Sequence, residues 1–201
     1  LSKVVIKTDQ EPAILAMVDG LVKLRVDRGA GETIPENSAA YSHQSNGMVE
    51  RGVQSVEGMI RSLRSALEER INDKLEIGDA VWTWLVEYAS FLLNRMEVSK
   101  DGRTAYERNK GKKARVLGVE FGEAVLWKRR PVGGALGKLA VMWEDGVYLG
   151  TKGTTNELII GAGDGIYRTR TIQRKPLDER WSSEAIKRVA GVPWRKSDND
   201  P

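Results

Sequence analysis

The sequence has no cysteine and a single histidine, His43, among its 201 residues. Without cysteine there is no disulfide framework and no cysteine-based zinc site, and one histidine excludes any site built from several histidines. A metal ion would therefore need oxygen ligands, and sites of that kind favour Mg²⁺ or Mn²⁺ over zinc. The lack of cysteine also fits a reducing compartment.

Long apolar runs are missing as well. No run approaches the roughly 18 residues of a membrane-spanning helix, and no basic segment followed by an apolar one resembles a secretion signal. We therefore expect no membrane partner. The apolar share of 40% is ordinary for a globular protein, and the length suits one large domain or a medium and a small one.

The net charge of +4 is unevenly distributed along the chain. Residues 1–107 hold 13 Lys and Arg against 17 Asp and Glu, a net charge of −4, whereas residues 108–201 hold 19 against 11, a net charge of +8. A basic second half indicates contact with a polyanion such as nucleic acid. Solvated surface lysines and arginines would give the same count, so charge alone leaves both interpretations open.

The start of the chain predicts a strand that leads into a helix. Val4–Ile6 is a short apolar run, and Lys7-Thr8-Asp9 follows it. An acid at the carboxyl end of a buried strand is well placed for chemistry. Asp is also a preferred N-cap, and Pro12 supports a helix start nearby. Asp9 is therefore either a cap alone or a cap with a chemical role.

The segment Tyr41–Glu68 begins as a polar loop up to Asn46, turns at Gly47 and continues as a helix that ends between Ile71 and Lys74. Glu50 falls in the first turns of this helix, where negative charge is favoured and where a metal ligand would also be well held. The helix prediction rests on one apolar stripe with spacings of three and four, formed by Val49, Val53, Val56, Ile60, Leu63 and Leu67.

Two further helices follow. The segment Val81–Arg95 is apolar on nearly all sides and should be buried, with Trp82, Trp84, Tyr88 and Phe91 forming core rather than a surface for base stacking. Thr104-Ala105-Tyr106-Glu107 matches a capping box, which predicts a short helix ending before Gly111.

The sequence pattern changes at Gly118, where short strand-like runs alternate with Gly, Asp, Asn and Thr turns. Five such runs in a short stretch predict a small all-β domain of SH3-like barrel size. The runs are Phe121–Trp127, Leu139–Trp143, Gly146–Gly150, Asn156–Ile160 and Gly165–Ile172. Trp181 and Trp194 flank a last short helix, Glu184–Ala190, and are expected to dock onto the barrel.

These patterns predict an α/β fold with three parts. Residues 1–113 form a mostly helical α/β domain, residues 114–176 form the small β-barrel, and residues 177–201 form a tail with a short helix. If the first part is an incomplete sheet, the Val4–Ile6 strand should keep an unpaired edge or an exposed apolar face.

Taken together, the segments resemble the retroviral and retrotransposon integrase family of copia-like or gypsy-like elements. The resemblance covers residues 1–113 and is carried by Lys7-Thr8-Asp9, by His43-Gln44-Ser45-Asn46-Gly47-Met48-Val49-Glu50, and by Arg103–Arg108 with Gly111-Lys112. Ala105 stands where the family's closing segment has proline. The β-rich second half is similar in type to the C-terminal barrels of integrases.

The resemblance implies an RNase H-like catalytic core, here its C-terminal part, and a site of two Asp and one Glu that binds two Mg²⁺ or Mn²⁺ ions. Asp9 would be the second Asp and Glu50 the Glu, with a long spacing of 41 positions that an insertion around 29–37 can absorb. Such a site joins DNA by metal-dependent phosphoryl transfer. The first Asp would lie on a strand upstream of Leu1, so we expect residues 1–201 alone to be inactive.

The resemblance also implies partners. An intact integrase binds the ends of its element and target DNA, acts as a homo-oligomer, and works in the nucleus. The DNA-contacting residues would be Gln44 and Asn46 beside the site and Arg51, Arg61 and Arg64 on the long helix. In the last strand, alternation puts Arg168, Arg170 and Arg174 on one face, which suits phosphate contacts but is equally typical of a solvated strand face. The alternative function is a non-catalytic nucleic-acid-binding protein that uses the basic barrel.

Overall fold

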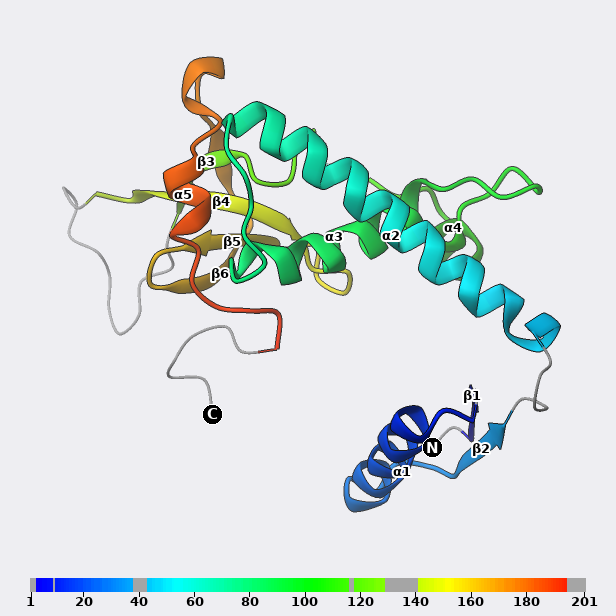
Figure 1. Ribbon diagram of the computed structural model, residues 1–201. Helices are drawn as coiled ribbons and strands as arrows, with labels where there is room; N and C mark the ends of the chain where they lie inside the picture. Colours follow the sequence, from blue (N-terminus) through cyan, green and yellow to red (C-terminus); the bar gives the residue numbers. More distant parts are fainter. Residues whose placement is uncertain (1–2, 9, 38–42, 116–117, 129–140, 195–201) are drawn as a thin grey trace. The chain divides into compact units, whose positions relative to one another are not determined.

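The structure is a computed structural model, and it describes residues 3–8, 10–37, 43–115, 118–128 and 141–194 (Figure 1). The chain divides into two compact units, Leu1–Ser55 and Val56–Pro201, called unit 1 and unit 2 below. Helix α2 (His43–Ile71) runs through the division. The fold combines helices with a five-stranded antiparallel sheet, as expected for a mixed α/β protein.

Unit 1 is built around a strand, a helix and a second strand. Strand β1 (Val4–Thr8) pairs in parallel with β2 (Thr33–Asn37), and helix α1 (Pro12–Asp27) connects them. The register sets Val4 opposite Thr33. A parallel pair requires such a crossover connection. The strand and the helix are therefore confirmed, although β1 alternates between half-buried and exposed residues instead of being fully buried.

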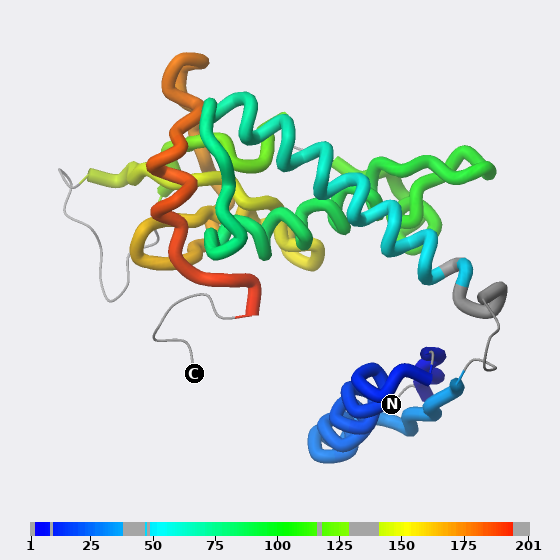
Figure 2. The backbone as a smooth tube through the Cα atoms, viewed as in Figure 1, coloured from blue at the N-terminus to red at the C-terminus, as the bar shows by residue number. Residues whose placement is uncertain are grey.

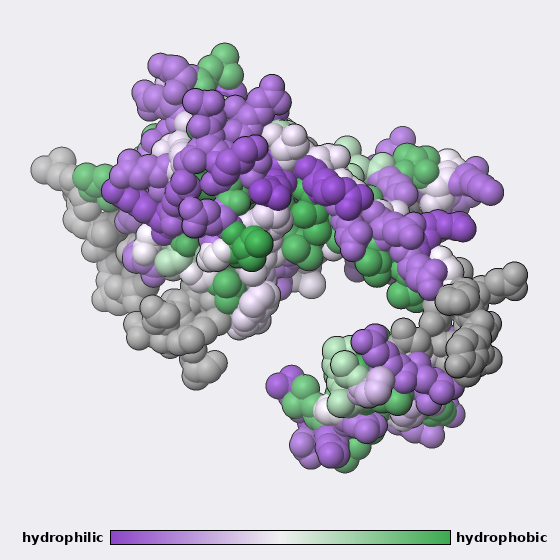
Figure 3. Space-filling model, in the orientation of Figure 1, coloured by the Kyte–Doolittle hydropathy of each residue, from purple (hydrophilic) through white to green (hydrophobic). Residues whose placement is uncertain are grey.

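Much of the apolar surface of unit 1 is exposed. Among the described residues β1 pairs only with β2, and Val5 is 53% exposed. Only Val18 of α1 is buried, whereas Met17 and Val26 are largely exposed. Figure 3 shows green apolar residues at the surface of this unit. The expected exposed apolar face is present.

The helical part of unit 2 follows α2. The chain reverses after Ile71, and α3 (Val81–Met96) runs back in roughly the opposite direction (Figure 2). Helix α4 (Ala105–Lys110) begins with the predicted capping box: Thr104 Oγ1 accepts a hydrogen bond from the Glu107 amide, and the Glu107 carboxylate accepts one from the Thr104 amide. Gly111 ends this helix with a φ of 66°, a conformation that favours glycine.

The sheet of unit 2 is strongly curled. Its strand order is β6-β5-β4-β3-β7, so the two edge strands β6 and β7 are consecutive in sequence and separated by only Arg170 and Thr171. The rings of Trp127 on β3 and Tyr167 on β6 stack 4.6 Å apart although two strands lie between them in the sheet. The strands are β3 (Ala124–Lys128), β4 (Trp143–Thr151), β5 (Leu158–Ala162), β6 (Gly165–Thr169) and β7 (Ile172–Arg174).

One hydrophobic core joins the helices to the sheet. Leu67 of α2 and Trp84 of α3 belong to the same buried cluster as Val125 and Ile160 of the sheet. Short helix α5 (Ser183–Lys187) and the residues after it add Ile186 and Val189 to that cluster. The expected boundaries at residues 113 and 176 therefore do not coincide with the division into units, because one core spans both.

The aromatic residues follow the prediction except at the end of the described chain. Trp84 and Tyr88 are buried, and Trp82 and Phe91 pack against the core as partly buried residues. Trp181 also packs against the core, after the 3₁₀ turn Leu177–Glu179. Trp194 is 78% exposed, so the expectation that it docks is wrong.

Candidate functional site

Asp9 follows β1 directly but lies outside the described residues. The structure therefore does not test its expected proximity to Glu50. The start of α1 is described: its N-cap residue is Glu11, which makes no side-chain cap hydrogen bond, and Pro12 opens the helix. Asp9 precedes this N-cap by two positions, and its expected role as a helix cap stays a prediction.

Glu50 lies on α2 and is exposed to solvent. The helix begins at His43, so the expected loop up to Asn46 is wrong; Gln44 and Asn46 lie within the first turns of the helix. The positions of their two side chains are outside what the structure describes. Val49 and Val53 flank Glu50 and are 64% and 51% exposed, so the apolar stripe of α2 is uncovered around the predicted ligand.

The fit of a divalent cation depends on donor chemistry. Glu50 and Asp9 offer carboxylate oxygens, which are the ligands that Mg²⁺ and Mn²⁺ prefer. Within the described part of the chain no group of three His, Asp or Glu residues could hold a metal ion. The donor type therefore fits the expected ions.

The three arginines of α2 differ in their surroundings. Arg51 is exposed, and Arg61 is also exposed, 3.8 Å from the carboxylate of Glu57. Arg64 is engaged within the fold: its Nε lies 2.7 Å from Glu68 Oε1, and its guanidinium lies over the ring of Trp82. Arg51 and Arg61 are therefore better placed than Arg64 to contact a partner.

Near the end of α2, the Glu68 carboxylate accepts hydrogen bonds from two cationic side chains and one backbone amide. Lys74 Nζ lies 2.9 Å from its Oε2, Arg64 bonds its Oε1, and the Leu75 amide donates to it as well. The hydrogen bond from Lys74, followed by the one from Arg64, lowers the pKa of Glu68 to about 2. The cluster joins α2 to the loop before α3, which is a structural role.

The arginines of the last strand do not form one row. Arg168 on β6 and Arg170 in the connection after it are exposed. Arg174, on β7, instead forms two hydrogen bonds to Glu123, with Nε at 2.6 Å from Oε1 and Nη2 at 2.8 Å from Oε2. The strand is interrupted at residues 170–171, between β6 and β7, and this interruption ends the alternation that the sequence predicts.

Glu123 is the residue that sequence reasoning missed on this side of the sheet. Its side chain is fully buried, and Arg180 Nε lies 3.7 Å from Oε1 as a second cation. The Glu123 carboxylate accepts hydrogen bonds from two nitrogens of the Arg174 guanidinium, so these two donors are already used within the fold. A Glu just before an apolar strand, with arginines some fifty positions later, gives no recognisable signal.

No family model and no curated protein matches the chain. Over the described residues, no helix has both the length and the apolar character needed to cross a membrane.

Proposed function

We propose that this chain is part of an integrase-like polynucleotidyl transferase from a retroelement polyprotein. In this proposal residues 1–113 are the C-terminal part of an RNase H-like catalytic core, and the curled sheet that follows is an SH3-like, DNA-binding barrel. Asp9 and Glu50 are two of three carboxylates that hold Mg²⁺ or Mn²⁺. The partner is DNA, the intact protein is a homo-oligomer, and the site of action is the nucleus.

The observation that carries the proposal is the order of elements in unit 1. A parallel β-α-β unit has the Lys-Thr-Asp segment at the carboxyl end of its first strand, and a long helix with Glu50 as its eighth residue follows its second strand. Ligands in open α/β sheets bind at the carboxyl ends of the strands. This order supports the motif match at Asp9 and Glu50.

The shape of the second sheet supports the barrel. Two consecutive strands, β6 and β7, form its opposite edges, so the sheet curls toward closure, which removes exposed edges. Thr169 Oγ1 at the end of β6 donates to the Lys128 carbonyl at the end of β3, which links these two strand ends. A small curled sheet of this type fits a DNA-binding module.

The chemistry proposed for the site needs few protein groups. When bound, two divalent cations activate the attacking oxygen and stabilise the leaving oxygen at a DNA phosphate. The carboxylates of Asp9 and Glu50 would fix the positions of the ions, and the exposed Arg51 and Arg61 would contact DNA phosphates. Residues 1–201 contain two of the three expected ligands, so we expect them not to join or cleave DNA on their own.

Binding of Mn²⁺ to residues 1–201, followed by electron paramagnetic resonance, tests the assignment without requiring activity. Asp9→Asn and Glu50→Gln should each weaken Mn²⁺ binding by about tenfold or more. Glu57→Gln is the matched control, since Glu57 is an exposed acid two turns further along α2. Equal Mn²⁺ affinity of the wild type and both site variants would remove the proposed metal ligands.

The alternative, a non-catalytic nucleic-acid-binding protein, is favoured by the basic second half alone. It predicts DNA binding that weakens with salt together with no effect of Asp9→Asn on Mn²⁺ affinity. Mg²⁺-dependent strand transfer by residues 1–201 that Asp9→Asn abolishes would instead contradict the expectation that the third carboxylate lies outside these residues.

A further inference from the structure

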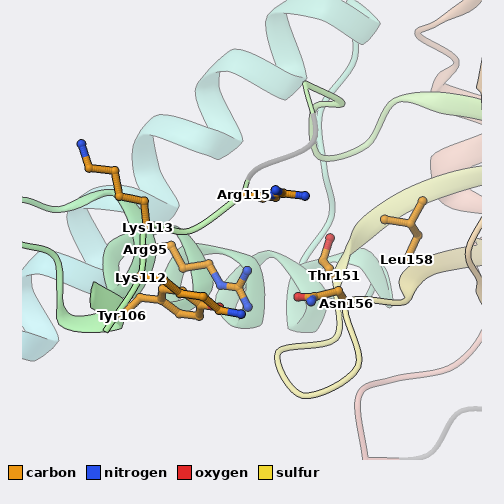
Figure 4. A pocket seen from close by; sticks show the side chains of 8 residues that line it. All are labelled: Arg95, Tyr106, Lys112, Lys113, Arg115, Thr151, Asn156 and Leu158. Carbon is orange, nitrogen blue, oxygen red and sulfur yellow. The ribbon is translucent and has the colours of Figure 1, made fainter. Parts of the chain in front are cut away.

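A pocket of about 900 Å³ lies between the helical part and the sheet of unit 2 (Figure 4). Its size is in the range of ligand sites in proteins. The lining residues come from α3, α4, the segment after α4, and the β4–β5 hairpin: Arg95, Tyr106, Lys112, Lys113, Arg115, Thr151, Asn156 and Leu158. Four of these eight carry a positive charge, and none carries a negative one.

Arg95 is the buried cation of the pocket. Only 5% of this residue is exposed. The guanidinium carbon lies 4.3 Å from the ring centroid of Phe91 and 4.6 Å from that of Tyr106. Figure 4 shows the guanidinium extending toward the side of the pocket formed by Thr151 and Asn156. The two rings hold the planar cation, and its end is directed into the pocket.

The guanidinium of Arg95 has no hydrogen-bond or ion-pair partner among the residues that the structure describes. The guanidinium nitrogens of Arg95 still reach solvent. Over the same described residues, the side-chain atom that is both fully buried and without a hydrogen-bond partner is Trp82 Nε1. Arginine is rarely this buried unless it is paired. Stacking on two rings offsets part of the cost of burial, but five N–H donors remain to be satisfied at the pocket end.

The surroundings of Arg95 increase the positive potential there. Lys112 extends beside Arg95 in Figure 4, and Arg115 lies across the pocket, whereas Lys113 points away. Thr151 and Asn156 provide neutral polar groups on the opposite wall. A planar guanidinium fork with adjacent cations matches the oxygens of a phosphate group, and burial in a low dielectric strengthens the attraction.

We propose that this pocket binds a phosphate group, with Arg95 as the buried ligand and Lys112 and Arg115 as flanking cations. The phosphate is either a phosphodiester of a nucleic-acid backbone or the phosphate of a small phosphorylated molecule. The volume exceeds that of a single phosphate, so the groups next to the phosphate also fit in the pocket. This site goes beyond the proposed function, because it uses none of the residues assigned to metal binding or strand transfer.

The test measures binding to two phosphate sources by wild-type residues 1–201. One arm titrates a fluorescent DNA duplex by anisotropy at several salt concentrations. The other follows thermal unfolding with inorganic phosphate or pyrophosphate against chloride at equal ionic strength. The variants are Arg95→Gln, the exposed double variant Lys112→Ala/Arg115→Ala, and the control Lys23→Ala, which removes one exposed cation from α1 in unit 1.

For a backbone phosphate, Arg95→Gln should weaken duplex binding roughly tenfold or more, as loss of a charge-assisted hydrogen bond does. The double variant should reduce the slope of log K against log salt by about 2. For a small phosphorylated molecule, phosphate or pyrophosphate should raise the Tm of the wild type, and both pocket variants should lose that rise while duplex affinity stays unchanged.

Either pattern supports the phosphate site and identifies its source. If Arg95→Gln does not fold, the exposed double variant still decides the question, because Lys112 and Arg115 lie on the surface. The proposal is overturned if the pocket variants match the wild type in both arms, or if Lys23→Ala has the same effects as they do. Asp9→Asn and Glu50→Gln should leave both arms unchanged, so failure here is separate from failure of the metal assignment.

Discussion

Replacing Arg174 with glutamine should destabilise unit 2 more than replacing its partner Glu123 with glutamine. The two side chains form one bidentate ion pair, with bonds of 2.6 and 2.8 Å that connect the residue before β3 to the last residue of β7. Their exposure differs sharply: Glu123 is fully buried, whereas 38% of the Arg174 side chain is exposed. The cost of each change depends on which charge is left behind.

Arg174→Gln leaves a carboxylate in the interior, where Arg180 at 3.7 Å is the remaining cation close to it. An uncompensated buried charge costs about 3–5 kcal/mol, and the presence of Arg180 favours the lower end, about 3 kcal/mol. Glu123→Gln leaves an arginine that reaches solvent, and the amide oxygen still accepts one hydrogen bond. Loss of the charged partner should then cost about 1–2 kcal/mol.

Urea unfolding followed by tryptophan fluorescence measures this difference, since all six tryptophans lie in unit 2. The double variant should cost less than the two single changes together, because removing both charges leaves no buried charge unpaired. The control is Glu184→Gln in the exposed Glu184–Arg188 pair, which should change the unfolding free energy by less than about 0.5 kcal/mol. A loss for Glu123→Gln equal to or above that of Arg174→Gln would refute the argument from burial.

Two further predictions concern unit 2. The hydrogen bond from Lys74, followed by the one from Arg64, lowers the pKa of Glu68 from its usual value near 4.5 to about 2. The resulting stabilisation is complete above pH 4.5 and is lost as the pH falls toward 2. Glu68→Gln should flatten this acid limb in fluorescence-monitored unfolding. An added Cβ at Gly146 would lie 2.4 Å from a side-chain carbon of Ile160, so Gly146→Ala should cost about 1–3 kcal/mol by overpacking in urea unfolding, whereas Gly153→Ala, with open space around it, should show no such loss.

Local patterns predicted local structure well. The capping box at Thr104 depends on four consecutive residues, and the structure contains both of its hydrogen bonds. The strand and the helix at the start of the chain were also predictable, because an apolar run marks the strand and a Pro marks the helix start. The start of α2 was not, since polar residues from His43 to Asn46 are typical of a loop as well as of a first helical turn.

The strands show where sequence patterns fail. Asp145-Gly146 is a usual turn signal, which predicted a break between Trp143 and Gly146. In the structure both residues lie inside β4, paired with Leu126 and Val125 of β3. Gly146 is required there by packing, because the side chains of the neighbouring strands close over its Cα. A glycine can mark a tight approach as well as a turn, and only the tertiary structure distinguishes the two.

The same limit applies to function. Asp9 and Glu50 emerge from a linear motif, and their joint role stays a prediction. Arg95 gives no such signal, because an arginine in the last turn of an apolar helix is ordinary, favoured there by the helix dipole. Its significance arises from Tyr106 on another helix and from the β4–β5 hairpin some sixty positions away, which together bury the cation and leave its donors facing a cavity. Over the described residues this buried cation has no charged partner, which is why we propose an anion from outside the chain, and the oxygens of a phosphate match a guanidinium fork flanked by two more cations.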